Sequence, residues 1–163
     1  MEARGATSGP RQYIDQLVAD AARTRRPMVF DSAPLIDFLS RHLGVSILVR
    51  SILLNRDAPK AISTITLNEI TTGAASIRDH ARVSEIWQFF AEIPNMSIVD
   101  FDQRHAIEAA YVRAAIGLKL PDAAIVATAR LADASALIGN DRQWRDKPLG
   151  VDYHHMDDIL DES

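Results

Sequence analysis

The sequence contains no cysteine among its 163 residues. This absence excludes disulfide bridges, thiolate metal sites and cysteine nucleophiles, and it fits a cytoplasmic protein, which is where we expect the chain to act. The sequence also lacks a hydrophobic run of about 18 residues, so we expect no membrane span. Residues 1–10 are small and polar, lack the hydrophobic centre of a signal peptide, and are predicted to be disordered.

An excess of positive charge is also missing. The formal net charge is −4, whereas a typical nucleic-acid-binding domain is basic, so the charge argues mildly against such a partner. The objection weakens if acidic residues gather in a metal site, because a bound cation reverses the sign of the local field. The hydrophobic content of 47% and the length are typical of one soluble domain with its own core.

Short β-rich runs alternate with segments of helical periodicity, which predicts an α/β protein with a mainly parallel sheet. The predicted strands are 28–30, 61–64, 97–99, 135–138 and a short strand within 148–153. The predicted helices are 11–24, 34–42, 45–55, 66–73, 78–93, 102–116 and 121–131. Among the details, we expect Thr64 or Thr66 to cap the fourth of these helices and Gly73 to end it. Asp102 is expected to cap the helix that ends before Gly117.

The helix predicted over 11–24 is amphipathic. Ile14, Leu17, Val18 and Ala21 recur on one of its faces. Because Pro27 and the first strand follow directly, we expect the helix to pack on its own domain or across a homodimer. We therefore divide the chain into an N-terminal extension, 1–26, and a domain, 27–163.

The segment from 118 to 144 is predicted to be a buried helix followed by a buried strand. Pro121 suits the first helical turn, and Asp122 beside it is favoured there by the helix dipole. The helix is apolar almost all round from 123 to 131, which is typical of a buried helix. Turn residues from Gly139 to Asp141 end the strand. Since the chain folds back between them, Asp122 and Asp141 can be neighbours in space.

Two further carboxylates have similar positions: Asp31 follows the first strand, and Glu69 lies in the first turns of the helix after the second. Ligands of parallel α/β sheets bind beyond the carboxyl ends of the strands, so we expect all four carboxylates at one edge. Clustered carboxylates repel unless something compensates, and Mg²⁺ or Mn²⁺ prefers oxygen ligands. Such sites cleave phosphodiesters, because the metal polarises the phosphoryl oxygen and lowers the pKa of an attacking water.

Four segments, in this order, resemble the sequence motifs of PIN-domain proteins. They are Phe-Asp-Ser-Ala-Pro-Leu-Ile at 30–36, Ile-Thr-Leu-Asn-Glu-Ile at 65–70, Leu-Pro-Asp-Ala-Ala-Ile-Val-Ala at 120–127 and Ile-Gly-Asn-Asp-Arg-Gln-Trp at 138–144. The resemblance covers 28–153 and is closest to VapC-like toxins of bacterial toxin–antitoxin pairs. It implies a PIN-like three-layer α/β/α sandwich with a short, mainly parallel central sheet, preceded here by an extra N-terminal helix. It also implies a Mg²⁺- or Mn²⁺-dependent endoribonuclease that is dimeric and blocked by an antitoxin protein.

The resemblance also implies roles for individual residues. The metal-binding and catalytic residues would be Asp31, Glu69, Asp122 and Asp141. Polar side chains that could support them are Ser32, Asn68 and Asn140. Basic side chains that could contact RNA phosphates are Arg142, Arg145 and Lys147.

The sequence departs from the family at two places. Gly139 stands where the family often has Thr or Ser, so a hydroxyl that would support the site is missing and ion affinity can be altered. About 27 residues precede the first strand, whereas the family usually begins at that strand.

Each motif residue also has an ordinary structural interpretation. Asp31 could merely cap the next helix, Glu69 could be a solvated helix residue, and Asp122 a favourable first-turn charge. Asp141 is also a common turn residue. We expect both tryptophans, Trp87 and Trp144, to lie in the core. We expect the histidines to lie at the surface: His42, His80, His105, His154 and His155.

Two other functions remain open. A PIN-like fold that has weak or no catalysis could serve as an RNA- or protein-binding module, which Gly139 favours and the four carboxylates oppose. The second of these functions is that of a different phosphoryl-transfer enzyme with an acidic site. A haloacid-dehalogenase-type phosphatase would need an aspartate where Ala33 stands, and a receiver domain would need paired acids near the first strand and a late lysine, which are missing.

Overall fold

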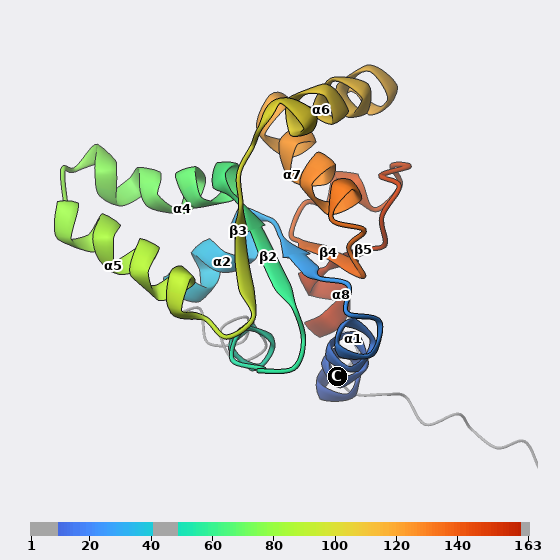
Figure 1. The fold of residues 1–163 in the computed structure, drawn as a ribbon, viewed down its shortest axis with the longest axis horizontal. Coiled ribbons are helices and arrows are strands. Elements are labelled where there is room, and N and C mark those ends of the chain that lie inside the picture. The colour runs from blue at the N-terminus through green and yellow to red at the C-terminus, as the bar shows by residue number, and fades with distance from the viewer. Residues whose placement is uncertain (1–9, 41–48, 161–163) are drawn as a thin grey trace, which may run out of the picture.

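Five strands form the central sheet of the computed structural model, which describes residues 10–40 and 49–160 (Figure 1). They are β1 (Met28–Phe30), β2 (Lys60–Ser63), β3 (Met96–Val99), β4 (Ala136–Gly139) and β5 (Tyr153–His155). Their order is β3-β2-β1-β4-β5 and every neighbouring pair is parallel. The predicted α/β class with a parallel sheet is confirmed, and all carboxyl ends meet at one edge of the sheet.

Helices connect and cover the strands. They are α1 (Pro10–Thr24), α2 (Ser32–Leu39), α4 (Thr64–Ser76), α5 (His80–Glu92), α6 (Gln103–Ile116), α7 (Leu120–Leu131), the short 3-10 helix η1 (Arg142–Trp144) and α8 (Met156–Leu160). Residues 49–53 are also helical, while the start of the helix predicted over 45–55, the end of the one over 34–42 and residues 1–9 lie outside the described ranges. None of the described helices has the length and hydrophobicity needed to cross a membrane.

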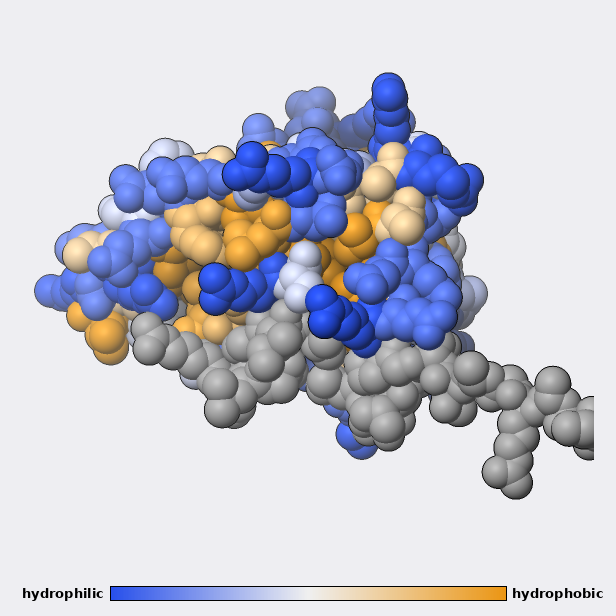
Figure 2. Space-filling model, turned by 90° about the horizontal axis from the view of Figure 1, so that it is seen from below, coloured by the Kyte–Doolittle hydropathy of each residue, from blue (hydrophilic) through white to orange (hydrophobic). Residues whose placement is uncertain are grey.

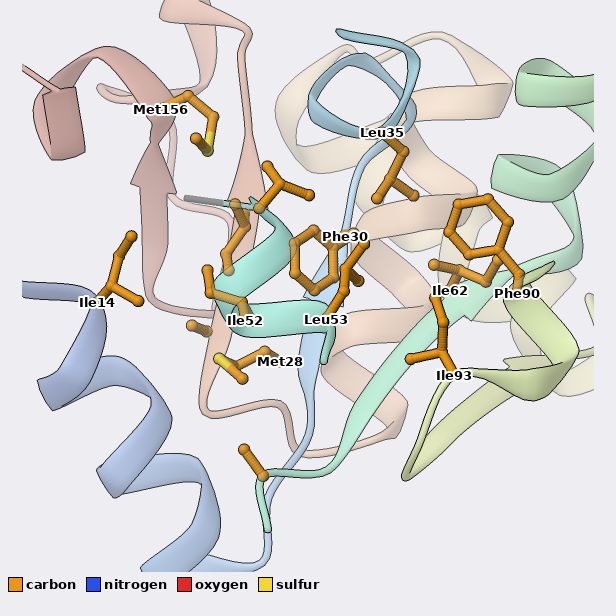
Figure 3. Packing of buried hydrophobic residues seen from close by; sticks show 14 of the residues in the cluster. Ile14, Met28, Phe30, Leu35, Ile52, Leu53, Ile62, Phe90, Ile93 and Met156 are labelled. Atoms are coloured by element: carbon orange, nitrogen blue, oxygen red, sulfur yellow. The ribbon is translucent and has the colours of Figure 1, made fainter. Parts of the chain in front are cut away.

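Successive side chains of the strands point alternately into two hydrophobic cores, one on each face of the sheet. In β1, Met28 and Phe30 point into the first core, and Val29 points into the second. Helices α1, α2, α5 and α8 cover the first core, whose side chains surround Phe30 in Figure 3. Helices α6 and α7 cover the second core, and α7 is buried continuously from Ala123 to Ala129. The fold is therefore the expected three-layer sandwich.

The N-terminal helix packs on its own domain. Ile14 and Ala21 are buried in the first core, and α1 contacts α8. The Tyr13 hydroxyl hydrogen-bonds Nδ1 of His154 in β5. This arrangement confirms one of the two packings expected for the amphipathic stripe.

Capping residues set the starts of the helices that follow the strands. Asp102 caps α6 and Gly117 ends it in the left-handed conformation, both as predicted. The expected threonine cap of α4 is wrong: Ser63 caps the helix, because its hydroxyl accepts a hydrogen bond from the Ile65 N–H at 3.1 Å. Gly73 does not end α4, since the helix continues to Ser76 with the glycine inside it.

Three further expectations are also wrong: two concern single residues and one concerns the position of the last strand. Trp87 is 52% exposed, because α5 turns Ile86 and Phe90 into the core and leaves Trp87 outside, whereas Trp144 is buried as expected. The last strand lies at Tyr153–His155, later than predicted. It therefore includes His155, which is buried against the expectation of a surface position.

Candidate active site

The four acidic residues stand at the carboxyl edge of the sheet, on four different elements. Asp31 directly follows β1 and caps α2, and Asp141 follows β4 and caps η1. Asp122 lies in the first turn of α7, and Glu69 in the second turn of α4. Because these helices start at the same edge of the sheet, residues distant in the sequence reach one region.

Asp31 is the most buried of the four, with 8% of its surface exposed. Burial, as the largest cause, and the charges of Glu69, Asp122 and Asp141 together raise the pKa of its carboxyl from 3.8 to about 7. The Ser32 N–H, which donates to Oδ1 of Asp31 at 2.7 Å, acts in the opposite direction. An ionised Asp31 is therefore disfavoured unless a positive charge approaches.

Asp122 is subject to the same influences. Burial raises the pKa of its carboxyl, and the charges of Asp141 and Glu69 add to the effect. Lys119 and Lys147 act against it as nearby positive charges. The charges of Glu69 and Asp141 thus act on both Asp31 and Asp122, so the four carboxylates share one electrostatic environment.

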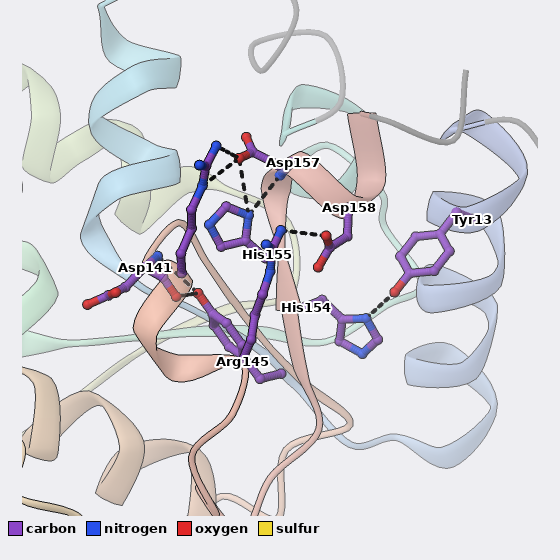
Figure 4. Close-up of polar contacts among 9 residues, drawn as sticks. Tyr13, Asp141, Arg145, His154, His155, Asp157 and Asp158 are labelled. Atoms are coloured by element: carbon purple, nitrogen blue, oxygen red, sulfur yellow. Dashed lines mark hydrogen bonds and ion pairs between the residues drawn. The ribbon is translucent and has the colours of Figure 1, made fainter.

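Asp141 is held by hydrogen bonds to its side chain and to its main chain. Its Oδ1 accepts from the Gln143 N–H at 2.8 Å. Its own N–H donates to the Tyr153 hydroxyl at 3.1 Å, and the same hydroxyl donates to its carbonyl oxygen at 3.0 Å. Figure 4 shows Asp141 among the polar contacts of this part of the molecule. Burial raises the pKa of the Tyr153 phenol, so that it remains protonated and able to donate.

The donor chemistry of this cluster fits a hard divalent cation, because every candidate ligand atom is a carboxylate oxygen. Within the described ranges, however, no three carboxylate or histidine side chains stand close enough together to hold one ion as they are. Like charges favour separation when no cation lies between them. The four acids therefore fit a metal by their chemistry, and coordination would need their side chains to turn inward.

The predicted supporting residues have simpler surroundings. Ser32 contributes its backbone N–H to Asp31. Asn68 is exposed, and its carbonyl oxygen accepts from the hydroxyls of Thr71 and Thr72. Asn140 is half-buried. In the part of the chain that the structure describes, neither asparagine side chain hydrogen-bonds the four carboxylates.

Two of the three basic residues expected to contact RNA phosphates, Arg142 and Arg145, are engaged by the C-terminal helix α8. Arg142 donates to Oδ2 of Asp157 at 2.8 Å, and Arg145 pairs with Asp158 (Figure 4). Lys147 donates to the Ile116 carbonyl oxygen at 3.4 Å. Sequence reasoning missed these α8 partners, because ion pairs between distant segments leave no local pattern.

Sequence reasoning also missed Tyr153, which belongs to none of the four motifs. Its hydroxyl reaches Asp141 across twelve residues of sequence. The only signal that could have indicated it is the glycine at 139, whose missing side chain leaves space for a neighbour.

Comparison with known proteins places this fold in a family. A family model of the PIN domain matches residues 28–148. No curated protein sequence matches the chain significantly.

Solved structures resemble it as well. A toxin–antitoxin complex from Klebsiella pneumoniae is 27% identical over 75% of this chain and 93% of that chain, with a TM-score of 0.59. VapBC2 from Rickettsia felis bound to a promoter DNA fragment is 15% identical over 78% and 97%, with a TM-score of 0.61. FitAcB from Neisseria gonorrhoeae is 18% identical over 78% and 96%, with a TM-score of 0.59. Because the family model spans well over half of its length, this chain belongs to the PIN domain family.

Proposed function

We propose that this PIN-domain chain is a Mg²⁺- or Mn²⁺-dependent endoribonuclease and the toxin of a toxin–antitoxin pair. The observation that carries the proposal is the buried carboxyl of Asp31, whose pKa is raised to about 7 by burial and by three neighbouring acids. Strongly perturbed carboxylates in a shared cluster are typical of functional sites. A cation would remove the repulsion, and the toxin–antitoxin complex among the structural neighbours supports the proposal that this chain is a toxin.

In this proposal, Asp31, Glu69, Asp122 and Asp141 hold the cation and orient the RNA. A bound Mg²⁺ or Mn²⁺ would polarise the phosphoryl oxygen and lower the pKa of the attacking water. Ser32 fixes Asp31 through its backbone N–H, and we include Asn68 and Asn140 as groups that could orient the carboxylates after they turn inward. Lys119 and Lys147 lie near enough to Asp122 to oppose the rise of its pKa, and their positive charges also attract the RNA backbone.

Arg142 and Arg145 are the proposed contacts for RNA phosphates. Both now pair with α8 carboxylates, which mimic the charge of a phosphate. The side chains of the two arginines are 76% and 36% exposed, so RNA could reach them and compete with Asp157 and Asp158. RNA binding therefore requires these ion pairs to open or to be shared.

We further propose that an antitoxin protein docks beside the acidic cluster. A groove of about 350 Å³ runs between α2, α4 and α5. Its hydrophobic lining includes Ile36, Ile70, Ile77 and Ile86, and Glu69 lies at its border with the acidic cluster. Figure 2 shows a broad hydrophobic area with a hydrophilic border on the face seen from below, where α5 lies in Figure 1. A hydrophobic segment carrying a basic side chain would match both the lining and Glu69.

We also propose that the protein is a cytoplasmic homodimer, and light scattering would measure its oligomeric state. We propose that residues 1–26 are an N-terminal extension and residues 27–163 are the PIN-like domain. The catalytically weak or inactive binding module, which Gly139 favours, is the alternative that the following experiment distinguishes.

The test is cleavage of a mixed-sequence RNA by the purified chain in Mn²⁺, Mg²⁺ or EDTA. We expect internal cleavage with either metal, none in EDTA and none with Asp122→Asn. Asp133→Asn, which removes a charge at the opposite edge of the sheet, is the matched control and should cleave normally. RNA binding without cleavage in Mn²⁺ would favour the binding module, and equal cleavage in EDTA would contradict the metal-dependent mechanism.

A further inference from the structure

Tyr153 fills the space that a side chain at position 139 would need. A Cβ added to Gly139 would lie 2.9 Å from both Cε2 and the hydroxyl oxygen of Tyr153, and 3.3 Å from Cζ. Gly139 is the last residue of β4, and not the first residue of the turn as expected, and it does not have a left-handed backbone conformation. The glycine is therefore needed for its lack of volume and not for conformational freedom.

The register of the sheet explains this contact. Leu137 of β4 is opposite Tyr153 of β5, and Gly139 is opposite His155. Tyr153 is thus the diagonal neighbour of Gly139 on the same face of the sheet, within reach of a long aromatic side chain. On its other side the ring packs against Trp144, with ring centroids 5.6 Å apart. The ring is wedged between β4 and η1, so its hydroxyl reaches a fixed point.

That point is the main chain of Asp141. The Tyr153 hydroxyl accepts a hydrogen bond from the N–H of Asp141 and donates one to its carbonyl oxygen. These two bonds fix the backbone of Asp141, so a rotation of its side chain away from the Gln143 N–H is enough to turn the carboxylate inward. Such an anchor has a purpose here, because repulsion from Asp31 and Asp122 would push an unrestrained Asp141 loop outward.

We propose that Tyr153 is a positioning residue, whose hydroxyl holds Asp141 toward the other three carboxylates and takes the place of the side chain that Gly139 lacks. This inference rests on the proposed metal site. Tyr153 does not touch the ion or RNA in this role; it acts through Asp141, and Gly139 is the condition for its access. The two positions therefore form one unit, in which neither can change alone without cost.

The test compares Tyr153→Phe, which keeps the ring against Trp144, with Tyr111→Phe, which removes a hydroxyl from an exposed tyrosine of α6. In the full-length chain, Tyr153→Phe should weaken Mn²⁺ binding by about tenfold, as expected when a group that orients a ligand is lost. We expect kcat for RNA cleavage to fall by a similar factor while KM changes little. Hydrogen exchange of the Asp141 amide, measured without metal, should accelerate. Tyr111→Phe should match the wild type in all three measurements.

A rescue experiment separates positioning from general damage. Gly139→Ser alone should displace the Tyr153 ring and weaken Mn²⁺ binding, whereas Gly139→Ser combined with Tyr153→Leu provides both room and a hydroxyl and should recover part of the affinity. Wild-type Mn²⁺ affinity in Tyr153→Phe would overturn the inference, as would a double variant no better than Gly139→Ser. A wild-type chain that binds no Mn²⁺ would instead refute the proposed function. In that case, hydrogen exchange of the Asp141 amide would still test whether Tyr153 anchors the backbone of Asp141. An unchanged exchange rate in Tyr153→Phe would overturn this anchoring role.

Discussion

Acidic residues at the two ends of the central sheet differ in whether they form ion pairs. At the amino ends of the strands, Asp133 pairs with Arg26 at 3.0 Å, and Arg130 at the same edge pairs with Glu108 of α6 at 3.1 Å. A cavity of about 460 Å³ lies at this edge and is lined by Asp133 and both arginines. At the carboxyl ends, none of the four motif acids forms a salt bridge with an arginine or lysine among the described residues.

Under the proposed function, this difference separates charges that complete the fold from charges that would hold a cation. Asp133 and Glu108 each have a counter-ion within the chain. At the carboxyl edge the acids mainly meet one another, and the pKa of Asp31 is raised to about 7 as a result of burial and repulsion. A protein retains such an unfavourable cluster where function requires it. Variants that change one edge and leave the other intact test this interpretation.

The largest expected effect is on catalysis. Asp31→Ala should lower metal-dependent RNA cleavage by about a hundredfold or more, comparable to the loss of a positioned catalytic group. Glu108→Gln, which breaks the Arg130 pair at the other edge, should change the rate by no more than about twofold, in line with the small energies of partly exposed ion pairs. Initial rates on one RNA at saturating Mn²⁺ measure both. Similar losses in the two variants would remove the distinction between the edges.

The next effect is on the pH dependence of stability. In the unfolded chain Asp31 releases its proton near its ordinary pKa of 3.8, whereas the folded state keeps the proton until about pH 7. Between these values the folded state binds more protons, so the free energy of unfolding falls as pH rises. The loss from this residue would be about 4 kcal/mol at most by pH 8.

Asp31→Asn keeps an acceptor for the Ser32 N–H but cannot ionise. Without metal it should therefore be more stable than the wild type at pH 8 and lack the decline between pH 4 and 7 that Asp31 causes. Urea unfolding at several pH values is the measurement, with Asp133→Asn as the control that keeps the decline. Wild-type and Asp31→Asn curves that run parallel over this range would contradict the unfavourable burial of Asp31.

The positions of these acids could be predicted from the sequence, because strand ends and helix starts have local signals. The hydrophobic run of β1 ends at Asp31, and Pro121 with Asp122 starts a helix that is apolar all round. Parallel topology then brings such ends to one edge by a general rule. Local patterns could also give the N-cap at Asp102, since its partner lies three residues away.

Other features depend on packing between distant segments and could not be predicted. The burial of His155 depends on where β5 joins the sheet. The pairing of Arg145 with Asp158 and the reach of Tyr153 to Asp141 depend on how α8 and β5 lie against η1. Nothing in the local sequence around Gly139 identifies which side chain fills its space.

A smaller effect is expected from Arg145, which lies near the carboxyl edge but pairs with Asp158. Arg145→Ala should raise KM for RNA by about threefold to tenfold, because one phosphate contact is lost, and should leave kcat nearly unchanged. Arg130→Ala, at the amino edge, should leave KM unchanged. Asp158→Asn should lower KM slightly, because it frees Arg145. A rise of KM in Asp158→Asn would show that α8 assists RNA binding and does not compete with it.

The smallest effect is expected for the paired charges of the amino edge themselves. Arg26 and Asp133 are 43% and 81% exposed, so solvent screens their attraction, and a double-mutant cycle should give a coupling energy of about 0–1 kcal/mol. Arg26→Ala alone should cost more than Asp133→Ala alone, because the Arg26 guanidinium also donates to the carbonyl oxygens of Asp133 and Ala134. Mn²⁺ should leave this coupling unchanged, since the counter-ion is already part of the chain. Urea unfolding of the wild type, the two single variants and the double variant, with and without Mn²⁺, gives the coupling energy. A coupling energy that disappears in Mn²⁺ would mean that the ion pair at the amino edge also responds to the metal, which contradicts the distinction between the two edges.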